Sequence, residues 1–290
     1  LRICVEEGLD AVTAIRMATL NAAECFDLKD RGAIAPGYRA DVVLLDDLKD
    51  FHVNRVFIQG ALVAEEGKYL PEIKRYDIST VKGSVIVKDF SAEKFKMHLK
   101  SNKVNVIKIL PGGVVTAKDT AEIQLDENGE FVRNPEEDIV KVAVVERHQG
   151  TGNVACGFLK GYGIKAGAVA LSIAHDSHNI IVVGVSDEEM EFAVNSLIAQ
   201  EGGMVLVKEG KVIESMPMPI AGLMSDQSGE WVDEKLTAIH AKAYEELGIA
   251  GDVEPVMTLC FMSLAVIPEV KLTDMGLFDV TTFSFIPVEA

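Results

Sequence analysis

The segment GAIAPGYRADVVLL, residues 32–45, decides how the first part of this chain folds. Its two glycines and Pro36 set a fixed path between two regular elements. The four apolar residues 42–45 at its end predict a buried strand. Upstream, Asp10 is a good N-cap residue for a helix that we expect to run to about Glu24. The segment is therefore expected to lead from a helix into a strand.

Two further strands are expected directly downstream, at 53–58 and 61–64. The dipeptide Gln59-Gly60 between them is typical of a hairpin turn. The polar stretch 68–76 then contains a proline, and we place a domain boundary close to it.

Beyond residue 80, expected strands alternate with expected helices. The helices are predicted over 92–99, 188–200 and 232–247, and the strands over 85–87, 104–110, 120–124, 140–147, 168–172, 180–185, 204–208 and 211–215. This order predicts an α/β or layered α+β fold. The apolar tail, 257–265 and 277–286, is expected to be packed or to form an oligomer interface.

Composition excludes several classes of partner. The 290 residues carry a net charge of −17, which disfavours binding to nucleic acid and to anionic membranes. No apolar run approaches the roughly 20 residues of a membrane-spanning helix. We expect a cytoplasmic protein with four reduced, buried cysteines: Cys4, Cys25, Cys156 and Cys260. Because Leu1 is not a start methionine, we also expect the chain to be a fragment of a longer protein.

Two parts of the chain resemble known proteins. The stretch ATLNAAECFDLKDRGAIAPGYRADVVLLDD is similar to the exit from the catalytic barrel of the amidohydrolase superfamily. The stretches VVERHQGTGN, AHDSHNIIVVG and MPIAGLMSD resemble the C-terminal domain of the adenine deaminases within that superfamily. The resemblance implies a last barrel helix at 1–27, part of a composite β-sandwich at 28–79 and a C-terminal α/β domain at 80–290.

The resemblance also implies a function. Members of this family hydrolyse adenine to hypoxanthine and ammonia, with divalent manganese or iron in the barrel, and a homo-oligomer, such as a dimer, is expected. The sequence has no His-x-His pair, and Asp10 is interpreted as a helix cap, so no barrel ligand is transferred to this chain. The isolated chain is expected to be inactive without the N-terminal barrel.

A polar cluster could hold a metal within the chain itself. His175 and His178 lie in a loop between two expected strands, and Glu146 and His148 end an earlier strand. Imidazole and carboxylate groups are metal ligands, and Asp176 could orient one imidazole ring. The alternative is structural: His178 forms hydrogen bonds that close the loop, and His175 packs against the sheet.

Three residues are candidates for contact with the substrate: Asp176, Asn179 and Asp226. Asn179 could instead close the loop through hydrogen bonds. Asp226 or Ser228 could instead cap the helix that follows.

Two alternatives to the deaminase assignment remain at this point. The chain could be a non-catalytic assembly or metal-binding module that braces an amidohydrolase barrel. It could also belong to a superfamily member that acts on an N-acyl sugar or a cyclic amide, which the second resemblance disfavours.

Overall fold

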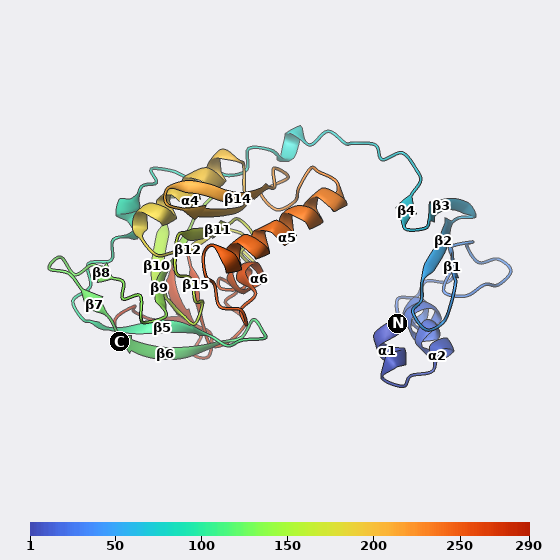
Figure 1. Ribbon diagram of the computed structural model, residues 1–290, viewed down its shortest axis with the longest axis horizontal. Coiled ribbons are helices and arrows are strands. Elements are labelled where there is room, and N and C mark those ends of the chain that lie inside the picture. The colour runs from blue at the N-terminus through green and yellow to red at the C-terminus, as the bar shows by residue number, and fades with distance from the viewer. The chain divides into compact units, whose positions relative to one another are not determined.

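The computed structural model describes residues 1–290 and divides into two compact units, 1–76 and 77–290. Helices and several sheets are mixed along the chain (Figure 1), so the predicted layered α+β class is confirmed. None of its helices combines the length and apolarity that crossing a membrane requires.

The first unit contains a short helix, a second helix that continues without interruption through a π-helical segment, and a small sheet. The elements are helices α1 (Arg2–Glu6), α2 (Ala11–Arg16) and α3 (Ala22–Cys25), with the π-helical turn η1 (Met17–Asn21), and strands β1 (Val42–Leu45), β2 (Val53–Ile58), β3 (Ala61–Glu65) and β4 (Lys68–Tyr69). The Asp10 carboxylate accepts the backbone N–H of Thr13 at 2.9 Å, which confirms the predicted start of the helix. The four strands form an antiparallel meander in chain order.

This unit has almost no core of its own. Only Ala14 and Ala23 are buried among its 76 residues. A groove of about 710 Å³ runs between its helices and β1, and Phe26 and Ile34 line the groove while being 76% and 90% exposed. The apolar faces that the sequence pattern predicted are present, but the residues of this unit do not bury them.

The second unit is built on an eight-stranded sheet in the order β14-β13-β11-β12-β9-β10-β5-β6. Its strands are β5 (Lys103–Ile109), β6 (Thr116–Glu122), β9 (Ile139–Val145), β10 (Val154–Lys160), β11 (Ala168–Leu171), β12 (Ile180–Gly184), β13 (Gly203–Lys208) and β14 (Lys211–Pro217). All neighbours are antiparallel except β10 and β5. Smaller elements are η2 (Ser79–Val81), η3 (Ala92–Phe95), β7 (Gln124–Leu125), β8 (Phe131–Val132), β15 (Val270–Thr273), β16 (Gly276–Asp279) and β17 (Ser284–Phe285).

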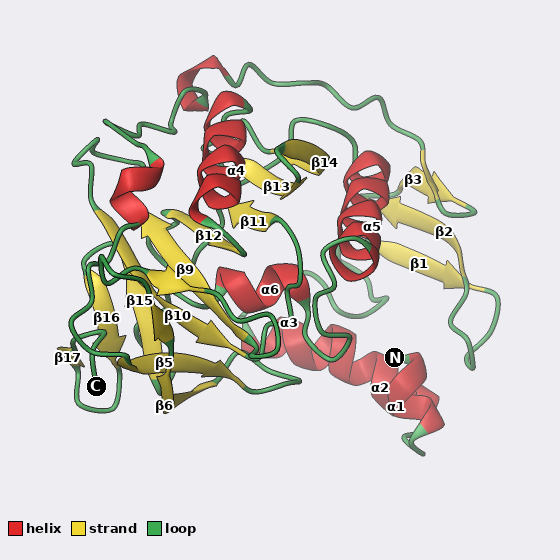
Figure 2. Cartoon of the chain, turned by 60° about the vertical axis from the view of Figure 1, so that its left-hand side comes forward, coloured by secondary structure: helices red, strands yellow, loops and turns green.

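Helices cover both faces of this sheet (Figure 2). Helix α4 (Asp187–Ala199) packs against β11, β12 and β13. Helices α5 (Gly229–Glu245) and α6 (Pro255–Cys260) join the core of the opposite face. Strand β9 is buried at all seven positions because its side chains alternate between two apolar layers. Each large apolar side chain buried in these layers contributes about 1.5–3 kcal/mol to stability.

Several local expectations are wrong. Residues 85–87 form no strand, and residues 92–99 form only the short 3-10 helix η3. Strand β10 and helix α6 were not predicted. The cysteines are free, as expected, but Cys4 and Cys25 are exposed rather than buried.

Candidate functional site

One end of the eight-stranded sheet gathers the polar loops. Strand β9 ends where β10 and β12 begin, since Val145 pairs with both Val154 and Ile180. The end of β11 lies beside the start of β13, and the start of β13 lies beside the end of β14. The loops 146–153, 172–179 and 218–228 therefore meet at this end, which we call the loop end of the sheet.

Glu146 folds the first of these loops. One carboxylate oxygen accepts the backbone N–H groups of His148 and Gln149 at 2.6 and 2.7 Å. The other accepts the backbone N–H and the hydroxyl of Thr151 at 2.9 and 3.1 Å. Burial alone would raise the pKa of Glu146, but these donors outweigh burial and lower the pKa to about 2. Glu146 is therefore an ionised loop anchor with both oxygens engaged.

His175 and His178 lie together in the second loop, with ring centroids 5.1 Å apart. The ring of His175 packs on Phe261 at 4.7 Å, and its backbone N–H donates to the carbonyl of Cys260. Nδ1 of His178 is buried without a hydrogen-bond partner. Burial lowers the pKa of His178, and the neighbouring His175 and Arg147 lower it further, which favours the neutral imidazole at pH 7.

The remaining candidates are divided between this cluster and its surroundings. Nε2 of His148 lies 2.7 Å from the carbonyl oxygen of Ser177. Asp176, which directly precedes Ser177, is exposed. The buried Asn179 accepts the backbone N–H of Arg147 through Oδ1 at 3.3 Å, as the loop-closing alternative predicts.

Asp226 does not join this set. Its Oδ1 accepts a hydrogen bond from Gln227. Ser228 is the N-cap of α5, because its Oγ accepts the backbone N–H of Trp231 at 3.3 Å.

The structure contains no group of three or more His, Cys, Asp or Glu side chains that could hold a metal ion. Glu146, His148, His175 and His178 all belong to the loop end, but the oxygens of Glu146 are already engaged. Metal binding by these four residues stays a prediction that the geometry does not support.

Arg147 is the residue that sequence reasoning missed. It stands between two candidates, yet its side chain is only 1% exposed. Nε donates to the carbonyl of His178 at 2.5 Å, and Nη2 donates to the carbonyl of Ala221 at 3.2 Å. A third, longer contact of 3.5 Å reaches the carbonyl of Ser84. Arg147 thus ties the second and third loops to the end of β9.

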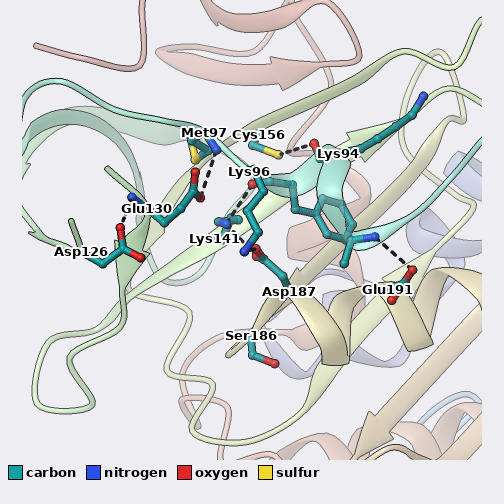
Figure 3. Close-up of polar contacts among 12 residues, drawn as sticks. Lys94, Lys96, Met97, Asp126, Glu130, Lys141, Cys156, Ser186, Asp187 and Glu191 are labelled. Carbon is teal, nitrogen blue, oxygen red and sulfur yellow. Dashed lines mark hydrogen bonds and ion pairs between the residues drawn. The ribbon is translucent and has the colours of Figure 1, made fainter. Parts of the chain in front are cut away.

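A second polar cluster lies at the opposite end of β9. Lys141 is 5% exposed and donates from Nζ to Asp187 at 2.7 Å and to the carbonyl of Phe95 at 2.9 Å. Lys96 approaches the other oxygen of Asp187 at 3.3 Å. Figure 3 shows both lysines converging on Asp187, at the start of α4. A half-buried carboxylate held by two cations fastens α4 to the sheet and is best explained as structural.

The comparisons with known proteins match two families along the chain. A family model described as the adenine deaminase C-terminal domain matches residues 113–284, which include the whole loop end. The amidohydrolase family model matches residues 1–63.

Individual relatives carry the same names. Adenine deaminase 2 of Desulfotalea psychrophila is 66% identical over 290 residues, covering 100% of this chain and 50% of that protein. The adenine deaminase of Ligilactobacillus salivarius is 50% identical over 289 residues, again covering 100% of this chain and 50% of the relative. The chain thus spans about half the length of the curated relatives it matches, and it belongs to the adenine deaminase C-terminal domain family.

Proposed function

We propose that this chain is the carboxyl-terminal half of a metal-dependent adenine deaminase, which hydrolyses adenine to hypoxanthine and ammonia. The observation that carries the proposal is the 66% identity across the full chain to half of a protein named adenine deaminase 2. The amidohydrolase match over residues 1–63 supports it, because that family performs hydrolysis in a barrel.

The burial pattern of the first unit supports the same proposal. A unit of 76 residues with two buried side chains lacks the apolar burial that a domain of this size needs to fold alone. We propose that the other half of the whole protein covers its groove. The amidohydrolase family implies a divalent metal, manganese or iron in our proposal, but no group of residues in this chain fits it. We place the metal ligands in the other half.

Activity measurements test the proposal directly. We expect the whole protein, loaded with manganese or iron(II), to release ammonia from adenine, and residues 1–290 alone to release none above background. Ammonia release by the isolated chain would overturn the placement of the chemistry upstream. A whole protein that is inactive on adenine but active on another cyclic amidine or amide would overturn the substrate.

The loop-end side chains belong to this proposal as substrate-side candidates. Asp176 is exposed, and the imidazoles of His175 and His178 lie 5.1 Å apart in the same loop. We expect His178→Ala to lower the turnover of the whole enzyme while its metal content stays constant. A drop in melting temperature with unchanged turnover would assign His178 a structural role only.

A second candidate function is a bracing or assembly module without chemistry of its own. Phe283 and Phe285, at 74% and 54% exposure, both pack on Phe278 and form an apolar patch that favours this candidate. Light scattering tests it, since a homo-oligomer such as a dimer is expected and a strict monomer would count against it. A cytoplasmic location accompanies either candidate, because four free cysteines are typical of a reducing compartment.

A further inference from the structure

We propose that Arg147 is a positioning residue that holds the loop 174–179 in the conformation in which His175, Asp176 and His178 meet the substrate of the whole enzyme. The proposal rests on the proposed adenine deaminase function. Arg147 itself is too buried to touch a substrate, so it acts through the loop.

The first argument is connectivity. The guanidinium reaches the carbonyl oxygens of His178 and Ala221, which belong to two different loops, and that of Ser84 before the sheet begins. The backbone of Arg147 adds to this, because its N–H donates to Asn179 and its carbonyl accepts from Ile86. One residue at the end of β9 therefore fixes three chain segments that are distant in sequence.

The second argument is strain. His178 and Ala221 have φ values of 53° and 57°, in the left-handed region that residues with a side chain rarely adopt. These are the two residues whose carbonyls accept the shorter bonds from Arg147. Left-handed backbone at a non-glycine residue persists only where surrounding contacts enforce it, and such residues cluster at functional sites. The guanidinium supplies that enforcement at both positions.

The third argument is that stability alone does not favour this arrangement. The buried guanidinium forms hydrogen bonds only to carbonyl oxygens, and the neighbouring Glu146 carboxylate attracts its charge without a hydrogen bond, so burial still disfavours the charged form. Two neighbouring polar atoms, Oγ of Ser84 and Nδ1 of His178, are buried without a partner. Buried polar atoms without a partner occur at five residues of the second unit, and two of the five belong to residues whose carbonyls accept hydrogen bonds from Arg147. Unsatisfied polar groups of this kind are expected where function requires them.

Close packing of the third loop restricts the position of the Arg147 side chain. A Cβ on Gly222 would lie 2.7 Å from Nη1 of Arg147, so the third loop closes directly over the guanidinium. The hydroxyl of Ser172, which is fully buried, lies 2.5 Å from the carbonyl of Gly222 and 2.6 Å from the backbone nitrogen of Gly203. Ser172 thus joins the second and third loops to each other and to the start of β13.

The test compares Arg147→Ala, Arg147→Lys and the control Arg133→Ala in the whole enzyme. Arg133 also donates to a backbone carbonyl, that of Ile164 at 3.0 Å, but it lies at the other end of β9, beside Lys141. We expect Arg147→Ala to lower kcat/KM for adenine by about 10- to 100-fold, the range seen when supporting residues of a site are removed. Bound metal should stay unchanged, and Arg133→Ala should stay within about threefold of wild type.

Chemical rescue separates positioning from a general loss of structure. Guanidinium ion at about 10 mM, far below denaturing concentrations, should restore part of the activity of Arg147→Ala and none of a His178→Ala variant. Arg147→Lys keeps the charge but cannot reach two carbonyls in a fork, so it should fold and still lose activity. Full activity in folded Arg147→Ala, or a loss that guanidinium does not restore, would overturn the proposal.

A readout without catalysis distinguishes this proposal from the deaminase assignment. In histidine-labelled protein, the imidazole signals of His175 and His178 should shift and broaden in Arg147→Ala and return with guanidinium. If wild type shows no adenine deamination, the assigned function fails while these signals still report positioning. Unchanged imidazole signals in the variant would overturn positioning whatever the substrate.

Discussion

Glu146 and Arg147 are neighbours in sequence, and the charge of each is removed from water in a different way. Glu146 accepts four hydrogen bonds from its own loop, so its charge is stabilised locally. Arg147 donates to carbonyls of distant segments, so its side-chain hydrogen bonds form only when three parts of the chain are in place. Loss of Glu146 should therefore disturb one loop, and loss of Arg147 should disturb the whole loop end.

Replacing Glu146 by Gln should lower the free energy of unfolding by about 1–3 kcal/mol at pH 7, because charge-assisted bonds to backbone N–H groups are lost. The pKa of Glu146 falls from 4.5 to about 2 on folding, so its contribution is present above pH 4.5 and is lost as the pH falls towards 2. Urea titrations between pH 2 and 7 measure this. The matched control is Glu136→Gln on an exposed acidic loop, and an equal effect of both changes would contradict the assignment.

Lys271 predicts a pH dependence in the alkaline range. Its side chain is fully buried, with Nζ donating to the carbonyl of Val114 at 2.9 Å, and burial lowers its pKa from 10.5 to about 8. Between these values the unfolded chain binds the proton and the folded chain does not, so stability rises with pH by up to about 1.4 kcal/mol per unit.

Denaturation at pH 7.5 to 10 measures that rise, and Lys271→Met should remove it. The exposed Lys211, replaced by Met, serves as the control and should keep the rise. An identical pH profile in wild type and Lys271→Met would show that Lys271 keeps its ordinary pKa in the folded protein.

At the scale of the sheet, two glycines with the same backbone conformation have different surroundings. Gly167 and Gly210 have φ values of +67° and +66°. A Cβ on Gly167 would lie 1.9 Å from the carbonyl oxygen of Val207, whereas nothing lies within 4 Å of a Cβ on Gly210. Gly210→Ala should cost about 1 kcal/mol for the left-handed backbone alone. Gly167→Ala should cost a further 1–3 kcal/mol from overpacking, which thermal melts of both variants would show.

Sequence patterns predicted several of the helices and strands well. Strands β1, β2, β11 and β12 and helix α4 appear within about one residue of the expected ranges, because apolar runs and a capping serine determine them locally. The layered fold class follows from the same patterns.

Elements that depend on tertiary partners were not predictable in this way. Residues 85–87 are apolar enough for a strand. Their one backbone hydrogen bond runs from the N–H of Ile86 to the carbonyl of Arg147, which lies beyond the end of β9, so they have no strand to pair with. Strand β10 contains Cys156 and Gly157, and Gly157 lies against the side chains of Leu272 and Leu277 from a distant part of the chain.

The candidate site shows the same division. The sequence pattern identified the polar loops but not Arg147. Three polar residues in a row, Glu146, Arg147 and His148, are typical of an exposed strand end, so nothing in the sequence indicates that the arginine is buried. Only the paths of the loops 172–179 and 218–228 reveal that the arginine is buried between them.

The start of α6 is the one signal in the sequence that could have been used and was not, because Pro255 directly follows the capping residue Glu254.

At the scale of the whole molecule, the two units differ sharply in how much they bury. The second unit holds three apolar clusters, and the first holds two buried alanines. The stability of this chain should therefore come almost entirely from residues 77–290.

This asymmetry predicts an unusual response to mutation. Ile34 is 90% exposed and lines the groove of the first unit. Ile34→Asp should change the melting temperature of this chain very little, since exposed substitutions cost within about 0.5 kcal/mol. In the whole protein the same change should lower it by several degrees, because the covered groove would then bury a charge.

The control is Ile73→Asp, which is 75% exposed and lies outside the groove. It should have little effect in either form. Equal effects of Ile34→Asp on the chain and on the whole protein would contradict the proposal that the other half covers the groove.

The central strands β9 and β12 are buried on both faces, and this burial also determines how slowly their backbone amide protons exchange with solvent. In deuterated water their amide protons should exchange last and all at one rate, because only complete unfolding of the second unit exposes them. Amides of β1 to β4 in this chain should exchange within the first minutes, through openings that leave the large sheet intact. A peptide map of deuterium uptake would then show fast-exchanging peptides before Asp77 and slowly exchanging peptides from the sheet of the second unit after it.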